Sequence, residues 1–517
     1  MKQFILLLFS LTYCLSVWAQ ISEGGFPPSF NVSQKKLLRA DTAPLSIKVD
    51  KDIERLKWED SITERNGASP RVAVIIPVNI DITQSGTWET LSDGRRICRL
   101  TINSPDALGI ILYYEKFDIP KDAKLFIYNK DKTQLLGAYT KNTNTKGGRF
   151  STEIVYGDEL TLEYVNLSDS AENPKIIIDG IGYGYNHISD YDDSVKPKLG
   201  YGDSASCEVD VNCSEGNNWK IQQKGIAKII TKNGTFSYYC SGSMINNSRN
   251  DYTPYFLSAY HCFYESDNPE FDTMQFYFHY EKAGCDTEES ESSVNARTKT
   301  MIGAELLVAN KIYGGSDGAL LRLNTAIPTD YDVCYNGWDV SSVPAENGVS
   351  IHHPQGDVKK ISTFKNSAVS GTYSDKYGTS IPNAHWVVNF VQTENGYGIT
   401  EGGSSGSPLF NQNGLIVGSL TGGSSSCSNP SGSENYSKLV YNWTQSEDES
   451  LHMQKYLSPD NPNLTSLDKL YPFDQPLIVN TDSVRLRENT TYSVNIMSGN
   501  GEYSVTVDNP GIAIASI

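Results

Sequence analysis

The chain has 517 residues, a formal net charge of −18 at pH 7 and an unusually high count of 31 tyrosines. This length allows roughly two to four domains, each with its own hydrophobic core. The surplus of acidic side chains argues against nucleic acid or an anionic membrane as the main partner. Frequent aromatic and turn-forming residues, with few long helical periodicities, predict an all-β protein.

Residues 1–19 have the pattern of a secretory signal peptide. Lys2 gives a short basic start, residues 4–11 form an apolar run, and Val17-Trp18-Ala19 is typical of a cleavage site before Gln20. The apolar run is too short to span a membrane. We therefore expect a secreted, extracellular protein with no membrane span and with oxidised cysteines.

Strand-like alternation follows between residues 71 and 185. Its clearest segments are residues 72–77, 123–129 and 160–165. This pattern predicts a β-sandwich without a catalytic constellation. The polar stretch 187–202 then predicts an exposed linker. We expect residues 20–198 to be a pro-region that contains this sandwich and is removed during maturation.

The segment 402–408, Gly-Gly-Ser-Ser-Gly-Ser-Pro, is the strongest candidate for a catalytic turn. A nucleophilic serine needs a tight glycine-flanked turn, on which backbone N–H groups can converge on the carbonyl oxygen under attack. A glycine-serine run alone would also suit a linker. The apolar strand expected at residues 415–418 favours the catalytic interpretation, with Ser405 as nucleophile and the N–H groups of Gly403 and Ser405 as the oxyanion hole.

Two upstream segments supply partners for this serine. His261 follows an aromatic-apolar stretch and precedes Cys262, and Asp317 heads the apolar run Gly-Ala-Leu-Leu. The order His261, Asp317, Ser405 is one of the known orders of a catalytic triad. Three other aspartates compete with Asp317, but none precedes an Ala-Leu-Leu strand: Asp330, Asp332 and Asp339. The pair His352-His353 before Pro354 predicts a structural turn, with a substrate contact as the alternative.

Nine cysteines occur in the chain, of which Cys14 lies in the predicted signal peptide. Six of the seven from Cys207 onward can pair in an oxidising compartment, in 15 possible ways. A bridge between Cys240 and Cys262 would fix the loop that carries His261. Metal ligation is the rival explanation, but no C-x-x-C or paired Cys/His spacing supports it. We expect neither a metal nor a cofactor.

From about Cys207 to Trp443 the chain resembles the lysyl endopeptidases, a bacterial branch of the trypsin-like (chymotrypsin-fold) serine proteases. The matching segments are residues 240–247, 255–262, 336–339, 351–354, 400–409 and 422–428. The resemblance implies two six-stranded antiparallel β-barrels with the triad in the cleft between them. It also implies three disulfides, Cys207–Cys427, Cys213–Cys285 and Cys240–Cys262. Cys98 and Cys334 are then left unpaired, with Cys334 as a small buried hydrophobe.

The resemblance also points to a specificity pocket, where the chain departs from the family pattern. The family holds the substrate lysine with an aspartate, and the matching residue here is Glu434. The family's histidine before Gly-Gly corresponds to Thr421, and its aromatic pocket residue to Phe390. A carboxylate in a partly desolvated pocket still prefers a cation. The alternative is that Glu434 is a solvated loop acid.

The residue that precedes Ser405 bears on how such a protease would be activated. Trypsin becomes active when its new N-terminal amine pairs with an aspartate just before the nucleophile. Here that position is Ser404, so no such ion pair can form. Latency would instead come from the pro-region, and Lys198-Leu199 is the expected maturation site, cut by the enzyme itself.

We therefore expect residues 199–460 to form a trypsin-like protease domain. Residues 475–517 resemble the opening half of an immunoglobulin-like β module. The predicted function is that of a secreted, monomeric serine endopeptidase that acts on proteins or peptides after Lys or Arg through an acyl-enzyme. Two alternatives stay open: a secreted adhesin with a non-catalytic protease-like domain, and a serine protease of another specificity.

Overall fold

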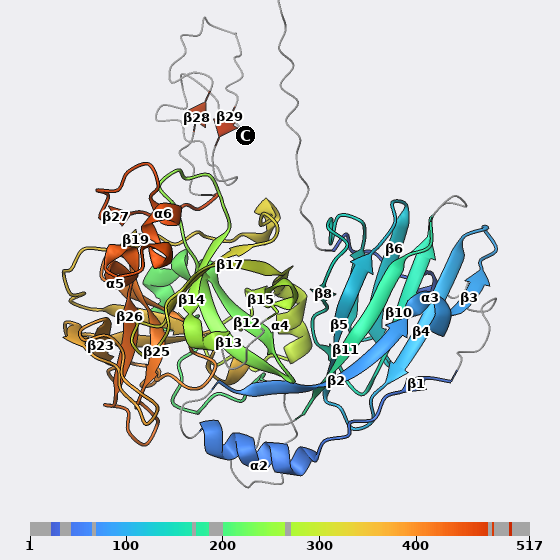
Figure 1. The fold of residues 1–517 in the computed structure, drawn as a ribbon, viewed down its shortest axis with the longest axis horizontal. Coiled ribbons are helices and arrows are strands. Elements are labelled where there is room, and N and C mark those ends of the chain that lie inside the picture. Colours follow the sequence, from blue (N-terminus) through green and yellow to red (C-terminus); the bar gives the residue numbers. More distant parts are fainter. Residues whose placement is uncertain are drawn as a thin grey trace, which may run out of the picture.

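The computed structural model describes residues 22–31, 43–64, 69–167, 172–185, 200–263 and 270–473, together with two short strands at 478–479 and 496–498. The predicted signal peptide, most of the predicted linker and most of the predicted C-terminal module lie outside these residues. No helix in the described ranges is long and apolar enough to cross a membrane. We call the described residues up to 185 the N-terminal unit, and residues 200–473 the central unit (Figure 1).

The N-terminal unit is built from two sheets. The first sheet has six strands: β1 (Leu45–Ser46), β3 (Thr87–Thr90), β4 (Arg96–Asn103), β6 (Ala123–Asn129), β7 (Leu135–Tyr139) and β10 (Glu159–Asn166). The second sheet begins with β2 (Arg71–Asp81), β5 (Gly109–Asp118), β8 (Phe150–Ser151), β9 (Val155–Tyr156) and β11 (Lys175–Gly184). Both sheets turn alternate apolar side chains toward a shared core, as the period of two in their sequences predicted.

The second sheet does not end with the N-terminal unit. Strand β2 pairs with β11 on one side and with β13 on the other, which joins the two units into a sheet of 12 strands (Figure 1). The central unit contributes β12 (Ile226–Asn233), β13 (Phe236–Met244), β14 (Tyr255–Ala259), β15 (Gln275–Phe278), β16 (Lys299–Ile302), β17 (Ala304–Ala309) and β18 (Gly318–Leu323). The sequence analysis did not predict this continuous sheet.

The second half of the central unit forms a separate sheet of nine strands. Its members are β19 (Trp338–Asp339), β20 (Gly348–His352), β21 (Lys360–Phe364), β22 (Val369–Gly371), β23 (His385–Asn389), β24 (Pro408–Asn411), β25 (Ile416–Gly423), β26 (Ser433–Lys438) and β27 (Ser466–Leu467). Strand β27 pairs with β19, and Leu470 exchanges backbone hydrogen bonds with Tyr335. The central unit thus continues past the predicted boundary at residue 460, because this segment packs the partly buried Leu464 and Leu467 against the core.

Helices are short and few in the described residues. The α-helices are α2 (Ile53–Glu64), α3 (Ile82–Ser85), α4 (Glu291–Arg297), α5 (Leu439–Thr444) and α6 (Gln454–Leu457). The 3-10 helices are η1 (Pro28–Phe30), η2 (Ser214–Trp219), η3 (Gln222–Gly225), η4 (Tyr260–Cys262), η5 (Phe271–Thr273), η6 (Thr329–Tyr331), η7 (Pro354–Gly356) and η8 (Glu449–Leu451). The protein is therefore mostly β, as its composition predicted. The two six-stranded barrels stay a prediction, because the strand pairings give open paths.

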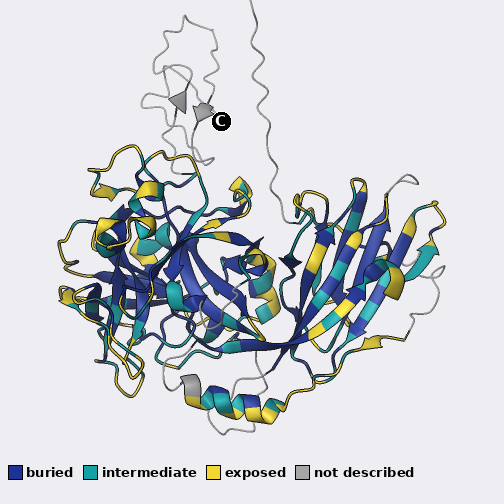
Figure 2. Ribbon diagram, viewed as in Figure 1, coloured by how far each residue is buried: buried dark blue, intermediate teal, exposed yellow. Residues whose placement is uncertain are grey.

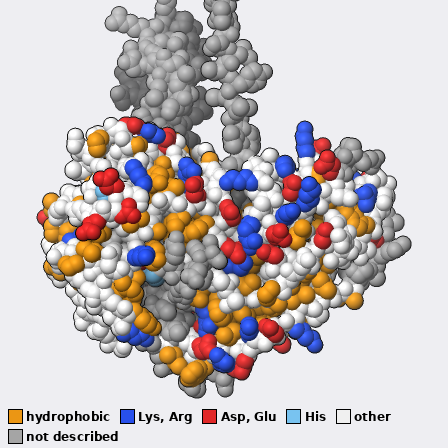
Figure 3. All heavy atoms as spheres, viewed as in Figure 1, with side chains coloured by type: hydrophobic (Ala, Val, Ile, Leu, Met, Phe, Trp, Pro, Cys, Tyr) orange, Lys and Arg blue, Asp and Glu red, His pale blue; other side chains and the backbone are white. Residues whose placement is uncertain are grey.

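Buried residues run through both units and across the strand that joins them (Figure 2). One core cluster contains Leu112 and Ile178 of the N-terminal unit together with Ile229 and Phe276 of the central unit. On the face drawn in Figure 3, acidic and basic side chains are interspersed among the described residues. Of the predicted C-terminal module, the structure describes only β28 (Ile478–Val479) and β29 (Ile496–Ser498), which pair with each other.

Three disulfides link the central unit: Cys207–Cys427, Cys213–Cys285 and Cys240–Cys262. These are the pairings that the resemblance implied. Cys98 and Cys334 form no disulfide, and both are buried. Cys334 has no exposed surface, in keeping with a small buried hydrophobe.

Candidate active site

The pairing of two strands brings His261 and Asp317 together. Strand β14 is antiparallel to β18, and its last residue, Ala259, lies opposite Gly318, the first residue of β18. His261 follows β14 by two residues and Asp317 directly precedes β18, so both side chains lie at the same edge of the sheet. The His261 Nδ1 atom is 2.7 Å from Asp317 Oδ2, and the His261 backbone N–H donates to Oδ1 at 2.9 Å.

Asp317 is held in an unusual backbone conformation. Its φ of +74° lies in the left-handed region, which residues other than glycine adopt at a cost in free energy. Its backbone C=O accepts from the N–H of Tyr260 at 2.7 Å, and its side chain has no exposed surface. The ring of His261 keeps 21% of its surface exposed. The carboxylate can thus orient the imidazole from inside, while part of the ring stays exposed.

Ser405 lies on a turn, residues 401–406, that we call the nucleophile turn. Its backbone C=O accepts from the N–H of Ser241 in β13 at 2.8 Å, and this oxygen lies 3.6 Å from Sγ of Cys262, the neighbour of His261. Gly406 has a φ of +82°, and a Cβ added there would lie 2.2 Å from Oγ of Ser258 in β14. Only glycine therefore allows the nucleophile turn to approach the strand that leads to His261.

The nucleophile turn presents two backbone donors. Gly403 has a φ of +88°, and its C=O accepts from the hydroxyl of Ser241 at 2.8 Å. Among the residues that the structure describes, the N–H groups of Gly403 and Ser405 have no hydrogen-bond acceptor. Two free N–H groups on one turn can serve an oxygen that develops negative charge.

Glu434 lies inside the molecule and not on a solvated loop. It belongs to β26, lies opposite Gly423 in β25 and is 1% exposed. Its carboxylate accepts from Thr400 Oγ1 at 2.6 Å and from the N–H of Ser425 at 2.8 Å. Burial raises the pKa of Glu434 to about 7, although both hydrogen bonds act against this rise. A cation nearby would stabilise the ionised form.

The other two predicted pocket residues, Thr421 and Phe390, lie in different surroundings. Thr421 is buried next to the Gly422-Gly423 segment, and its Oγ1 is 3.1 Å from Nε2 of His385. Phe390 lies in the core of the nine-stranded sheet, packed with Trp386 and Tyr436, and is 2% exposed. The predicted role of Phe390 in a substrate pocket stays a prediction.

Two residues near this pocket were not predicted from the sequence. The centre of the buried ring of His385 lies 5.9 Å from that of Tyr373. The Tyr373 hydroxyl lies close to Gly422, within 4 Å of where a Cβ at that residue would be. Burial lowers the pKa of His385 to about 4, while the nearby carboxylate of Asp317 acts against this. His385 is therefore neutral near pH 7. Its sequence context gave no sign of this, because the proximity arises from pairing of β23 with β26.

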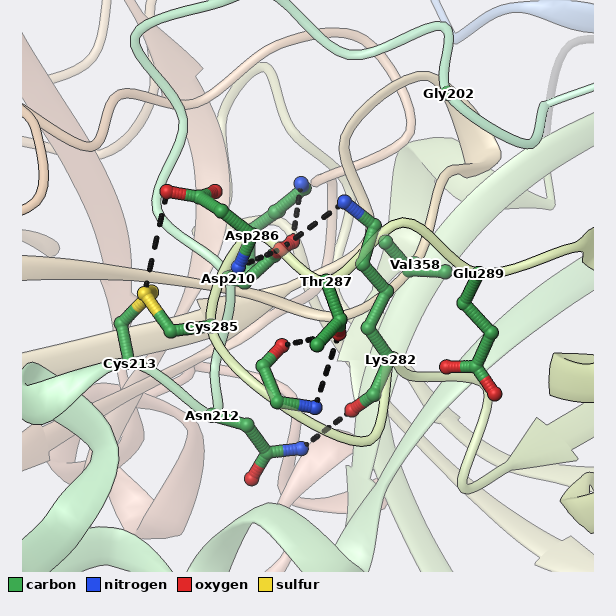
Figure 4. A network of polar contacts seen from close by, with 12 residues as sticks. Gly202, Asp210, Asn212, Cys213, Lys282, Cys285, Asp286, Thr287, Glu289 and Val358 are labelled. Atoms are coloured by element: carbon green, nitrogen blue, oxygen red, sulfur yellow. Dashed lines mark hydrogen bonds and ion pairs between the residues drawn. A yellow bond between two sulfur atoms is a disulfide. The ribbon is translucent and has the colours of Figure 1, made fainter.

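Ion pairs near the disulfide Cys213–Cys285 hold the first segment of the central unit in place (Figure 4). Asp210 accepts from Lys360 Nζ at 2.5 Å and lies 3.2 Å from Lys282 Nζ. The sulfurs of Cys213 and Cys285 lie close to the carboxylate of Asp286, in a group with metal-ligand spacing. The two sulfurs are bonded to each other, which removes the thiolates that a metal would need.

The chain is similar in sequence to known proteases. Residues 201–437 match the family model described as lysyl endopeptidase, C-terminal domain. A lysyl endopeptidase of Pseudomonas aeruginosa is 29% identical over 379 residues, which cover 69% of this chain and 75% of that protein. The chain is a serine endopeptidase, and we call the matched residues 201–437, which are similar to the lysyl endopeptidases, the endopeptidase domain.

Two solved protease structures have partial similarity to this chain. The MamO protease domain from Magnetospirillum magneticum is 13% identical, with a TM-score of 0.28, over 44% of this chain and all of that chain. The HtrA-type protease AlgW is also 13% identical, with a TM-score of 0.29, over 45% of this chain and 62% of that chain.

Proposed function

We propose that the endopeptidase domain hydrolyses peptide bonds with a triad of Ser405, His261 and Asp317. The observation that carries the proposal is the double hydrogen bond from His261 to Asp317, at 2.7 and 2.9 Å, beside a glycine-flanked serine turn. Asp317 then fixes the tautomer in which Nδ1 carries the proton, so that Nε2 can act as a base.

In this mechanism the Ser405 hydroxyl attacks the substrate carbonyl carbon while His261 Nε2 takes its proton. The oxygen that becomes negative accepts hydrogen bonds from the N–H groups of Gly403 and Ser405. The C–N bond breaks as His261 returns the proton to the leaving amine, which leaves an acyl-enzyme on Ser405. Water activated by His261 then releases the acid product.

We propose that cleavage follows lysine, with Glu434 as the counter-ion. Two observations support this proposal: the Pseudomonas relative is a lysyl endopeptidase, and Glu434 is buried. A buried carboxylate favours a cation strongly over a neutral or acidic side chain. Glutamate reaches one methylene further than the aspartate of the family, which shortens the space left for the substrate side chain. Thr421 and Phe390 are proposed to line the same pocket.

We further propose that the enzyme is secreted and that residues 20–198 are its pro-region. The leader-like residues 1–19 and the three disulfides support secretion. The two proposed barrels of the endopeptidase domain would carry the triad between them. The adhesin alternative has less support, because an adhesin would not need a buried aspartate hydrogen-bonded to a histidine.

The test is covalent labelling by a fluorophosphonate, which reacts with an activated serine. We expect one label, on Ser405, in the wild-type protein and none in Ser405→Ala. The His261→Ala variant should label far more slowly, because the serine would lose its base. Labelling of another residue, or of wild type and His261→Ala at the same rate, would contradict the triad.

A further inference from the structure

Ser404 precedes the nucleophile, at the position where trypsin carries the aspartate that its new N-terminus activates. Here its hydroxyl accepts from the backbone N–H of Glu401 at 3.2 Å and lies 2.7 Å from Nδ1 of His352. His352 is the last residue of β20 and is fully buried. The mechanism proposed above gives this histidine no role.

The hydrogen bonds of His352 link several side chains in a row, and only one placement of the protons satisfies all of them. The hydroxyl of Ser362 donates to the C=O of Ile399 at 2.8 Å, so its oxygen is left to accept from His352 Nε2–H at 3.0 Å. With its proton on Nε2, the neutral ring accepts at Nδ1 from the hydroxyl of Ser404. The remaining lone pair of Ser404 Oγ accepts from Glu401 N–H. Every donor in the chain thus has one acceptor.

The surroundings of His352 keep this chain neutral. Burial and the nearby Lys360 lower the pKa of His352 to about 3. The carboxyl group of Glu208 lies 3.9 Å from Nε2, and burial raises its pKa well above the usual range, which favours the neutral form of this group. Lys360 itself is held at 2.5 Å by Asp210. No proton transfer is needed for the chain to form.

The segment that follows His352 holds the two glycines that precede Ser404 in the nucleophile turn. The backbone N–H of His353 donates to Ser241 Oγ at 2.9 Å, and this hydroxyl donates to the C=O of Gly403. The N–H of Gln355 donates to the C=O of Gly402 at 2.7 Å. The two glycines directly before Ser404 are therefore tied to the end of β20 and the turn after it, Gly403 by way of the Ser241 hydroxyl.

We infer that His352 is a positioning residue that holds the nucleophile turn in its reactive conformation through a neutral hydrogen-bond chain. This chain takes the place of an ion pair between a new N-terminus and the residue before the nucleophile. The inference rests on the proposed role of Ser405. Its consequence is that the nucleophile turn is formed without any contribution from a charged α-amino group.

The test measures kcat and KM for His352→Leu, Ser404→Ala and the double variant. Each kcat is divided by the concentration of active sites that a fluorophosphonate titrates. We expect kcat per titrated site to fall by about 10- to 100-fold in each single variant with little change in KM, because displaced oxyanion donors weaken only the transition state. The double variant should lose little more than either single variant, since both break one chain. His352→Gln, whose amide can accept and donate, should recover part of the loss.

The matched control is His452→Leu, which removes a half-buried histidine bonded to the Ser446 C=O and should leave kcat unchanged. In the wild type, kcat should stay level between about pH 8 and pH 10, where an α-amino group would lose its proton. Unchanged kcat per titrated site in His352→Leu and Ser404→Ala would overturn the inference, as would a change in KM alone or a falling kcat above about pH 8. A wild-type protein that neither labels nor cleaves would instead refute the proposed function.

Discussion

The buried carboxyl group of Glu434 sets the charge of the proposed pocket. Its raised pKa, about 7, means that the group is mostly neutral at pH 6 and mostly ionised at pH 8. A substrate ammonium stays protonated across this range and prefers the ionised partner. Cation binding and ionisation of Glu434 are therefore linked.

This linkage predicts the pH dependence of binding by a small primary amine such as butylamine, used as a competitive inhibitor that mimics the lysine side chain. The inhibition constant should tighten by about tenfold between pH 6 and pH 8, because the ionised fraction of Glu434 rises by that factor. In Glu434→Gln the constant should be weaker by roughly 100-fold and flat with pH. A wild-type constant that does not change, or a variant that keeps the wild-type profile, would exclude Glu434 as the counter-ion.

At the residue scale, candidate residues could be predicted from the sequence where a short motif marks them. His261, Asp317 and Ser405 each lie in a short motif, and the structure brings His261 and Asp317 into contact. Tyr373 and His385 have no such motif. They reach the proposed pocket because antiparallel strands align residues far apart in the chain, and a single sequence does not reveal that register.

At the scale of elements, glycine lets the nucleophile turn approach β14. The Gly406→Ala variant would place a Cβ 2.2 Å from Ser258 Oγ and 2.5 Å from the Ser241 C=O, at a φ of +82°. The turn would have to move away from His261, so we expect kcat/KM to fall by more than about 100-fold. The measurement is peptide hydrolysis alongside thermal unfolding.

The matched control for this variant is Gly94→Ala. Gly94 has a similar φ of +88°, but a Cβ there would meet nothing within 4 Å. It should lose about 1 kcal/mol of stability from backbone strain and keep full activity. Equal activity of the two variants would show that the close approach of the nucleophile turn to β14 is not needed for catalysis.

The strands themselves were predictable to different degrees. The segment 123–129 coincides with β6, because it is a short run rich in apolar and aromatic residues that turns bound on both sides. The continuation of one sheet from β11 through β2 into β13 was not predictable, since edge pairing between two units leaves no mark in either pattern. The extent of the central unit beyond residue 460 was missed for a similar reason, because β27 has only two residues.

At the scale of the whole molecule, the N-terminal unit and the endopeptidase domain share a sheet and a core. Polar contacts also cross between them, including Tyr113 Oη to Ser237 Oγ at 2.7 Å and Ser151 Oγ to the Thr273 C=O at 2.9 Å. Such a buried contact is typical of a permanent interface. A cut in the chain between the two units would leave these contacts intact.

This arrangement predicts how maturation proceeds. Self-cleavage at Lys198-Leu199 should give a new N-terminus that reads Leu199-Gly200-Tyr201, and Ser405→Ala should accumulate uncleaved. After the cut, the N-terminal unit should still co-elute with the endopeptidase domain in size-exclusion chromatography, because the shared core holds it. Normal maturation of Ser405→Ala would mean that another protease makes the cut, and separation of the units directly after the cut would contradict a permanent interface.

The central claim, a serine endopeptidase that cleaves after lysine, is tested most directly by a cleavage profile. Purified wild-type protein and Ser405→Ala would each be incubated with a diverse peptide mixture, and the new termini identified by mass spectrometry. We predict cleavage almost entirely after lysine by the wild type and none by Ser405→Ala. Cleavage that persists in Ser405→Ala, or that follows acidic or apolar residues in the wild type, would contradict the claim.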